Sequence, residues 1–259
     1  MSFAVCRLSH APMRREPDVV SEMVNEVRGG EAVEVVGTAG KFWRARLLVD
    51  DYEGWVDSRQ FGVRGDGLPL VATHVTDDHC GEATMGEWAM AMPLGSPLPG
   101  YDGGTFLYGD ERWTWKGKVR EIPAAGTVPD VAELLHYARR YLRTPYLWGG
   151  RTVFGVDCSG FASSVLRAFG VEVRRDCVQQ IEEGEKVPDL ALAVPGDLVY
   201  FAPSGEAAQH VGIVLPCGEV IHSSAMVRID DLTERGIVNR ESGELTHRLK
   251  AVRRYVAWD

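Results

Sequence analysis

The chain has 259 residues, of which 45% are hydrophobic and 25% charged, a composition typical of a globular protein with room for two or three domains. Its formal net charge is −9, so it has no excess of cations to hold phosphate backbones, and we expect no nucleic-acid partner. The sequence contains no run of 18 apolar residues, so we expect no membrane-spanning helix and no membrane partner.

The cysteines and the N-terminus indicate a reducing compartment. Five cysteines lie at wide spacings without a C-x-x-C pair, which favours reduced thiols over a disulfide framework. The first residues, MSFAVCRLSHAPMRREP, contain no basic segment followed by an apolar one. We therefore expect a cytoplasmic monomer; removal of a leader before this sequence begins would instead indicate a periplasmic or secreted protein.

Residues 1–62 read as a small β domain. Strands are predicted over 31–36, 42–48 and 52–56, with glycine and aspartate turns between them. Short strands at this spacing are typical of a small barrel.

Residues 63–124 favour a second small β-barrel, with an irregular connector as the alternative. Strand-like segments flank a run rich in glycine and proline at 93–100, and they cover residues 68–75, 87–92, 105–108 and 113–120. His74, His79 and Cys80 are too loosely spaced for a zinc site and are interpreted as loop residues, so we expect no metal and no cofactor.

Residues 125–259 indicate a third domain. After a linker, Asp130 is placed to cap a helix whose apolar residues recur at helical spacing from Val131 to Leu142, and Thr144-Pro145 ends that helix. Helical patterns come first and strand patterns follow. This order predicts an α+β domain with an antiparallel sheet.

Cys158 is the candidate nucleophile. A second helix is predicted from this residue to Phe169, with Gly170 ending it, so the thiol lies in the first helical turn. The unpaired amides of that turn carry partial positive charge, which would lower the pKa of the thiol and could also stabilise an oxyanion. The alternative is an inert, buried cysteine.

His210 and His222 are the candidate base and its partner. A three-residue loop with Gly218 in the left-handed conformation would pair Leu215 with Glu219, Gly212 with His222 and His210 with Ser224. The two histidines would then share one face of the hairpin, whereas a two-residue loop would separate them. We expect His210 to take the thiol proton and His222 to bind its far nitrogen and fix the tautomer.

Five blocks in the catalytic half together resemble the NlpC-type cysteine peptidases, which are papain-like enzymes that cut peptidoglycan stem peptides. The blocks are Pro145-Tyr146-Leu147-Trp148-Gly149-Gly150, Asp157-Cys158-Ser159-Gly160-Phe161, Pro195-Gly196-Asp197-Leu198-Val199-Tyr200-Phe201, His210-Val211-Gly212-Ile213 and Val220-Ile221-His222. The resemblance covers about residues 130–259 and implies the roles of Cys158, His210 and His222, with Tyr146 near the nucleophile.

The N-terminal strands resemble bacterial SH3-like domains, in which strands of the type found here at Gly30-Glu31-Ala32-Val33-Glu34-Val35 and Gly54-Trp55-Val56 recur. The expected architecture is therefore multidomain, with one or two small SH3-like β-barrels (1–62 and 63–124) followed by an α+β papain-like, NlpC-type catalytic domain (125–259).

This combination resembles the γ-D-glutamyl-L-diamino acid endopeptidases, in which the SH3-like domain makes the enzyme demand a free N-terminal L-Ala. By that resemblance Tyr52, Asp157 and an acidic residue before the first barrel strand would hold the ammonium group. Glu22 fits the acidic position, and Glu26 is the alternative. Carboxylates suit such a site because a buried ammonium needs charged partners.

A further block, Arg174-Arg175-Asp176-Cys177-Val178-Gln179-Gln180, resembles an R-D-S-x-Q-Q block that lines the D-Glu site in the family. Ser159 and Asp176 remain candidates for that contact, whereas Cys177 stands where the family has serine and is a weaker hydrogen-bond donor. Asp176 could equally cap a helix through Ile181. Cys177 is also an alternative nucleophile, which we consider inferior to Cys158.

The resulting hypothesis is a cysteine peptidase that cleaves the γ-D-Glu–diamino acid bond of a murein peptide, L-Ala-γ-D-Glu followed by either meso-diaminopimelate or L-Lys, in peptide recycling. Two alternatives remain: an acyltransferase or amidase on the same scaffold, and a non-catalytic protein that binds cell-wall peptides.

Overall fold

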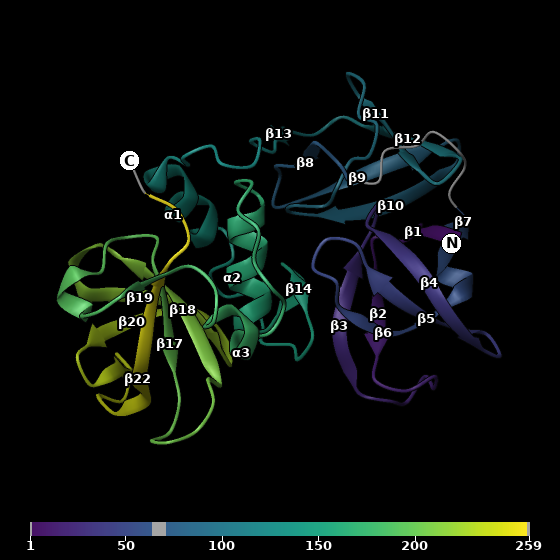
Figure 1. Ribbon diagram of the computed structural model, residues 1–259. Coiled ribbons are helices and arrows are strands. Elements are labelled where there is room, and N and C mark those ends of the chain that lie inside the picture. The colour runs from purple at the N-terminus through teal and green to yellow at the C-terminus, as the bar shows by residue number, and fades with distance from the viewer. Residues whose placement is uncertain (1, 64–70, 258–259) are drawn as a thin grey trace. The chain divides into compact units, whose positions relative to one another are not determined.

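A computed structural model describes residues 2–63 and 71–257, and these residues form two compact units (Figure 1). The first comprises Met1–Ile122 and Trp148–Phe154, and the second Pro123–Leu147 and Gly155–Asp259. The boundary expected between residues 124 and 125 thus lies two residues from the division after Ile122. Residues 68–70 of a predicted strand lie outside the described residues, and the three-domain division stays a prediction.

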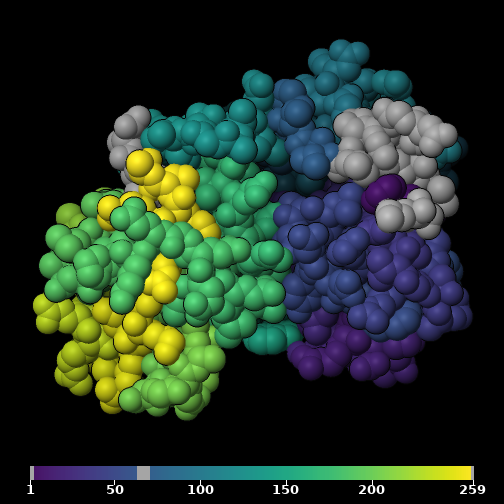
Figure 2. All heavy atoms as spheres, in the orientation of Figure 1, coloured from purple at the N-terminus to yellow at the C-terminus, as the bar shows by residue number. Residues whose placement is uncertain are grey.

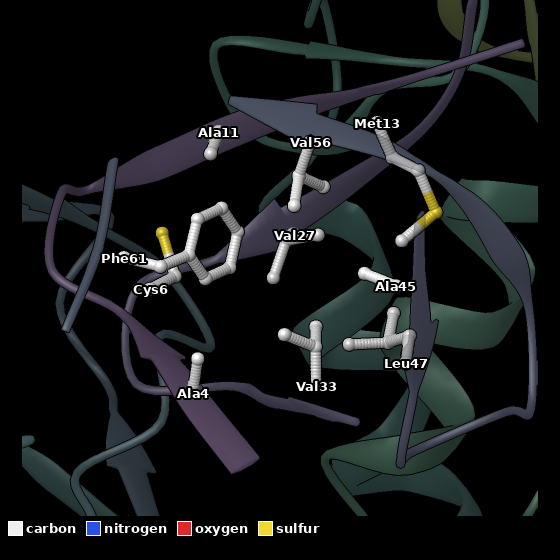
Figure 3. Packing of buried hydrophobic residues seen from close by; sticks show 10 residues of the cluster. All are labelled: Ala4, Cys6, Ala11, Met13, Val27, Val33, Ala45, Leu47, Val56 and Phe61. Atoms are coloured by element: carbon white, nitrogen blue, oxygen red, sulfur yellow. The ribbon is translucent and has the colours of Figure 1, made fainter. Parts of the chain in front are cut away.

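The N-terminal part of the first unit is an antiparallel sheet with strand order β3-β2-β6-β5-β4-β1-β7. Its strands are β1 (Ser2–Cys6), β2 (His10–Arg14), β3 (Met23–Arg28), β4 (Ala32–Ala39), β5 (Phe42–Leu47), β6 (Glu53–Asp57) and β7 (Phe61–Val63), with a 3₁₀ turn at Ser58–Gln60. The three predicted strands correspond to β4, β5 and β6. All seven strands contribute side chains to the small apolar core drawn in Figure 3, in which Val27, Val33 and Leu47 are fully buried.

Residues 74–121 also form strands, so this segment is not an irregular connector. A four-stranded sheet has the order β10-β9-β12-β11, and β13 pairs with β8. The bounds are β8 (His74–Thr76), β9 (Cys80–Met85), β10 (Trp88–Pro93), β11 (Thr105–Tyr108), β12 (Glu111–Trp115) and β13 (Val119–Glu121). His74 and Cys80 therefore lie in strands, and their interpretation as loop residues was wrong. Strand β9 escaped prediction because Ala83 is its only buried residue.

A cluster of buried charges lies within the first unit, around the segment Trp148–Phe154, which contains strand β14 (Arg151–Thr152). The Arg151 guanidinium donates to both carboxylate oxygens of Glu31, at 2.7 and 3.0 Å, and its side chain is fully buried. Arg28 also pairs with Glu31. Burial alone would raise the pKa of Glu31, but the two guanidinium groups lower it to about 2.

The second unit is an α+β domain with an antiparallel sheet, as predicted. Its helices are α1 (Val131–Arg139), α2 (Cys158–Arg167) and α3 (Cys177–Gln180). Its strands are β15 (Gly155–Val156), β16 (Glu185–Val187), β17 (Leu198–Phe201), β18 (His210–Leu215), β19 (Glu219–Ser224), β20 (Met226–Thr233), β21 (Gly236–Val238) and β22 (Leu245–Arg254), with 3₁₀ turns at Leu190–Leu192 and Pro216–Gly218.

Strand β22 closes this sheet into a barrel, because it pairs with β17 on one side and β21 on the other. Closure leaves an interior lined by alternate residues of each strand, including Val199, Val214 and Val252. The outer side of β22 remains partly exposed, and yellow atoms of this C-terminal segment are visible on the surface of the unit in Figure 2.

An aspartate caps each of the two longer helices of this unit, and the capping role of Asp130 was predicted from the sequence. Asp130 accepts hydrogen bonds from the amides of Ala132 and Glu133, and Asp157 accepts one from Gly160. Helix α1 ends at Arg139, three residues earlier than expected. Helix α2 packs against β18 and β19, so its N-terminus lies beside the predicted histidine hairpin. Each helix in the described ranges is too short or too polar to span a membrane.

Candidate active site

The thiol of Cys158 begins helix α2 and lies against strand β18. The side chain is buried, and the backbone amide of Val211, the residue that follows His210, hydrogen-bonds to it. Asp157 caps the helix through its Oδ1, which lies 2.7 Å from the Gly160 amide. The helix start therefore brings the predicted nucleophile next to the strand that carries the predicted base.

The pKa of this thiol is raised above its ordinary value, which corrects the expectation of a lowered one. Burial is the largest cause, followed by the negative charge of Asp157 and the neighbouring thiol of Cys177. The Val211 amide and Arg175 oppose these effects only in part. At neutral pH the resting site therefore holds a neutral thiol, and a base must remove its proton during the reaction.

The hairpin between β18 and β19 has the predicted three-residue turn, and both Cys217 and Gly218 adopt positive φ. Leu215 pairs with Glu219 and Gly212 with His222. The β18–β19 ladder ends at that pair and does not extend to the expected His210–Ser224 pair. On their other edges, His210 pairs with Phe201 of β17 and Ser224 with Met226 of β20. A Cβ at position 212 would lie 3.1 Å from that of His222, so glycine leaves room for this ring.

His210 and His222 share one face, and the predicted hydrogen bond between them is present. Nε2 of His210 lies 2.8 Å from Nδ1 of His222, with the rings nearly perpendicular at 86°. The other nitrogen of His222, Nε2, lies 3.0 Å from Oδ2 of Asp230 on β20. We call His210, His222 and Asp230 the imidazole relay.

Asp230 settles the proton positions along this relay. An ionised carboxylate only accepts hydrogen bonds, so Nε2 of His222 is the donor, and in a neutral ring Nδ1 is then the acceptor. Nε2 of His210 must therefore donate to it, which leaves the lone pair of a neutral His210 on Nδ1. This is the tautomer that a general base requires, and Nε2 is tied to its partner.

Asp230 stays ionised although it is buried. Burial alone would raise its pKa, but hydrogen bonds from His222, the Arg240 amide and Arg228 hold the pKa well below the ordinary value. Nε of Arg228 lies 2.8 Å from Oδ2, and the amide of Arg240 lies 3.0 Å from Oδ1. Burial, together with the charges of His222 and His247, lowers the pKa of His210 well below its ordinary value.

Arg175 holds the residues around the nucleophile in place. Its guanidinium donates to both carboxylate oxygens of Asp157, at 3.0 and 2.6 Å, and to the Ser159 hydroxyl at 2.9 Å. All three side chains are buried. Asp157 and Ser159, both predicted to contact substrate, are therefore engaged within the protein, and their substrate contacts stay predictions.

Asp176 and Cys177 begin helix α3, which supports the capping interpretation of Asp176. The Asp176 amide donates a hydrogen bond to Oε1 of the Gln179 side chain, at 3.3 Å. The thiol of Cys177 donates to the carbonyl of Ala208 at 3.2 Å, and burial, with the charges of Asp176 and Asp157, raises its pKa to about 11. The hydrogen bond to Ala208 engages this thiol, whereas the Cys158 thiol lies against the strand that carries His210, so Cys158 remains the better candidate nucleophile.

Tyr146 lies near the nucleophile, as the resemblance implies. Its amide donates to the carbonyl of Ala225, and its ring is partly exposed. Burial raises the pKa of the phenol, and the charges of Cys158 and Asp157 raise it further. The hydroxyl therefore keeps its proton at neutral pH and can donate a hydrogen bond.

Glu22 and Tyr52 belong to the first unit, whereas Asp157 belongs to the second, so their joint role stays a prediction. Glu22 is partly exposed, and its carboxylate accepts from Trp148 and pairs with Arg15, at 2.8 Å each. Glu26 is buried and its carboxylate accepts a hydrogen bond from the Arg151 amide, and burial raises the pKa of this carboxyl group. Of the two candidates, Glu22 is the accessible one.

The roles of Asp230, Arg175 and His247 in the site were not predicted from the sequence. The Arg174-Arg175 pair was visible beside Asp176, but nothing in the sequence linked it to Asp157. Predicting the position of Asp230 would have required the register of the following strand, β20, and predicting that of His247 would have required the closure of the barrel. Within the described ranges, no group of three His, Cys, Asp or Glu side chains is arranged to hold a metal ion.

A buried thiol at the start of a helix, packed on a closed antiparallel barrel whose strands carry an imidazole relay, defines the papain-like α+β class. Residues 143–244 match the model of the NlpC/P60 family. This segment of the chain is an NlpC/P60 domain.

Known proteins agree with this assignment. The γ-D-glutamyl-L-lysine dipeptidyl-peptidase of Bacillus subtilis (strain 168) is 34% identical over 134 residues, which cover 51% of this chain and 44% of that protein, less than half its length. Dipeptidyl-peptidase 6 of Lysinibacillus sphaericus is 25% identical over 260 residues, covering 89% and 92% of the two chains. The crystal structure of an NlpC/P60 family protein from Bacillus cereus ATCC 10987 shares the fold, with a TM-score of 0.82, 20% identity and coverage of 99% and 100%.

Proposed function

We propose that the chain is a cysteine peptidase of peptidoglycan stem peptides in which Cys158 is the nucleophile, His210 the base and His222 its orienting partner. The observation that carries this proposal is the imidazole relay, which leaves the lone pair of His210 on Nδ1 while the Val211 amide holds the Cys158 thiol beside the same strand. A buried relay with an ionised carboxylate at its end orients a general base and fixes its tautomer, as catalysis requires.

The reaction then follows from the protonation states. Nδ1 of His210 accepts the thiol proton as the sulfur of Cys158 bonds to the peptide carbonyl carbon. The resulting oxyanion is stabilised by amides at the start of α2 and by the Tyr146 hydroxyl. His210 then donates its proton to the leaving amine as the C–N bond breaks. Water attacks the thioester, His210 takes one water proton and returns it to the sulfur as the C–S bond breaks, and the product leaves as a carboxylic acid that loses its proton to solvent.

The substrate that we propose is L-Ala-γ-D-Glu-diamino acid, cleaved after γ-D-Glu. The B. subtilis relative is named for a γ-D-glutamyl-L-lysine bond, and the sequence blocks point to the same peptide class. Tyr52, Glu22 and Asp157 would hold the free amine of L-Ala, while Ser159 and Asp176 would line the D-Glu site. In intact peptidoglycan this amine is acylated, so the requirement favours released peptides and a role in murein-peptide recycling.

The test is hydrolysis of L-Ala-γ-D-Glu-meso-diaminopimelate and of its L-Lys counterpart, each with a free and an acetylated amine, by wild type and Cys158→Ala. Cleavage of the free peptides alone, lost in the variant, is the expected result. Cleavage of acetylated and free peptides alike would retain the peptidase and reject the amine requirement. The ratio of kcat/KM for the two free peptides identifies the preferred diamino acid.

Two other functions use the same scaffold. An acyltransferase or amidase would leave these peptides intact but accumulate a thioester on Cys158 from another acyl donor, which intact-mass measurement detects. A protein that only binds cell-wall peptides would show calorimetric binding that is equal in wild type and Cys158→Ala, without turnover. Either result, with a folded protein, would replace the peptidase proposal.

A further inference from the structure

A third histidine, His247, packs against the imidazole relay from strand β22. Its ring stacks on that of His210, with the centroids 4.2 Å apart and the planes 24° apart. It meets His222 edge-on, at a centroid distance of 5.8 Å and an angle of 77°. Its Nδ1 lies 2.9 Å from the hydroxyl of Thr246. His247 thus contacts the relay with the face of its ring.

The relay alone leaves one motion of His210 poorly restrained. The hydrogen bond at Nε2 fixes one edge of the ring, but the torsion about the Cβ–Cγ bond of histidine has broad energy wells. Rocking about that bond moves Nε2 little and moves Nδ1 more, and Nδ1 carries the lone pair that must reach the thiol. A flat ring stacked on the face of His210 opposes this rocking.

The same contact suits the charge that develops on His210. When Nδ1 accepts the thiol proton, the ring becomes a cation beneath the face of His247, and a neutral His247 ring avoids the like-charge repulsion that a protonated one would impose. The groups around His247 are His210, His222, Asp230, the apolar Phe201 and Ile237, and Thr246. Burial and the charge of His222 lower the pKa of His247 to about 4, so it is neutral at physiological pH.

We propose that His247 is a positioning residue that holds the ring of His210 by face-to-face stacking, so that Nδ1 remains directed for proton transfer from Cys158. This role rests on the proposed function of the triad, but it concerns a residue outside that triad. It depends on the flat π face of the side chain and not on its nitrogens.

The experiment compares His247→Ala, which removes the ring, with His247→Phe, which keeps a flat π face without a titrating group. Two readouts are used: kcat and KM on the murein tripeptide, and the rate at which iodoacetamide alkylates Cys158, followed by peptide mass spectrometry so that Cys80 and Cys217 do not interfere. His210→Ala provides the reference for loss of the base. His136→Ala, at an exposed histidine of α1, is the matched control.

His247→Ala should lower kcat about 10- to 100-fold with little change in KM, the scale expected when a catalytic group is misplaced by about 1 Å. Alkylation of Cys158 should slow in parallel, toward the rate of His210→Ala, while His247→Phe should stay within about threefold of wild type in both readouts. Thermal unfolding of each variant identifies any that must be assayed at a lower temperature.

Three outcomes would overturn the proposal: wild-type kcat and alkylation in His247→Ala, equal impairment of the Phe and Ala variants, or alkylation that is unaffected in His210→Ala. If the wild-type protein cleaves none of the peptides, the proposed substrate fails. The alkylation rates still decide the role of His247 in that case, because they require only the thiol and its base.

Discussion

The Nε2 atom of His222 lies 3.0 Å from the Oδ2 atom of Asp230, so this carboxylate governs which nitrogen of each relay ring carries a proton. Asp230 thereby extends the predicted trio of Cys158, His210 and His222 by one residue. Removing it leaves the tautomer of His222 unspecified, and with it the position of the lone pair on His210.

Asp230→Ala should therefore lower kcat on the order of 10²- to 10⁴-fold, the range found when a triad carboxylate is lost and the wrong tautomer forms. Steady-state kinetics on the murein tripeptide measures this loss. Asp231→Ala is the matched control, because its carboxylate is half-exposed and binds the guanidinium of Arg240, not a histidine of the relay. Equal activity of Asp230→Ala and wild type would show that the hydrogen bond between the two histidines suffices.

The pH dependence of activity should reflect the lowered pKa of His210. The base must be unprotonated to accept the thiol proton, and burial, followed by the charges of His222 and His247, lowers its pKa well below the ordinary 6.5. The free base therefore persists as pH falls through 6.5, and the acid limb of kcat/KM should lie below that value. A profile of kcat/KM from pH 4 to 8 measures it, with recovery at pH 7 after each acid exposure as the control for unfolding. An acid limb at or above pH 6.5 would contradict the assignment.

The residues found from sequence and those missed differ in how far their contacts reach along the chain. Cys158 follows from a local helix start, and the facing of His210 and His222 follows from one hairpin turn, so short-range rules suffice. Asp230 depends on the next strand, Arg175 on a loop that returns to Asp157, and His247 on closure of the barrel by β22. These contacts depend on tertiary packing, for which the sequence carries no periodic signal.

The predicted and the unpredicted elements of the fold differ in the same way, between local patterns and tertiary packing. Strands β4, β5 and β6 and the starts of both long helices were predicted because alternation and capping are local patterns. Strand β9 was missed because Ala83 is its only buried residue, which leaves no apolar alternation, and the grouping of Trp148–Phe154 with the first unit could not be predicted from composition. The raised pKa of Cys158 was also missed, because burial outweighs the helix terminus and burial is a tertiary property.

Gly212→Ala should reduce both stability and activity. The added Cβ would lie 2.5 Å from a methyl group of Val220 and 3.1 Å from the Cβ of His222, so either the strand or the ring must shift. Such overpacking costs about 1–3 kcal/mol, and a displaced His222 weakens the relay, so we expect at least a tenfold lower kcat. Urea unfolding and steady-state kinetics measure the two effects. Gly37→Ala is the control, since its new Cβ meets only that of Arg44 at 3.5 Å; equal behaviour of the two variants would disprove the steric argument.

Arg151→Met should destabilise the first unit by about 3–5 kcal/mol, because it leaves the buried carboxylate of Glu31 with Arg28 as its remaining guanidinium partner. The pKa of Glu31 is lowered to about 2 in the folded protein, so its contribution to stability is present above its ordinary value of 4.5 and is lost as pH falls toward 2. The difference between wild type and variant should therefore shrink below pH 4.5.

Urea unfolding of both proteins at pH 7 and pH 3.5 measures this change, with a fluorescence or exchange probe in the first unit. Arg44→Met is the matched control, since its pair with Glu53 is half-exposed and worth about 0–1 kcal/mol. A destabilisation by Arg151→Met that is equal at both pH values would mean that lost packing, and not the unpaired carboxylate, sets the cost.

The substitution Cys177→Ser distinguishes the roles of the two thiols, Cys158 and Cys177, near the proposed site. The Cys177 thiol donates to the carbonyl of Ala208, and its pKa is raised to about 11, so it is neither free nor ionised at neutral pH. Serine can donate the same hydrogen bond and restores the residue type of the resembled sequence block. We therefore expect kcat/KM within about threefold of wild type, while Cys158→Ser abolishes turnover because a serine hydroxyl is far harder to deprotonate. Intact-mass analysis of a trapped acyl-enzyme completes the test: an adduct that persists in Cys158→Ser and disappears in Cys177→Ser would move the nucleophile to Cys177 and exclude the relay from the reaction.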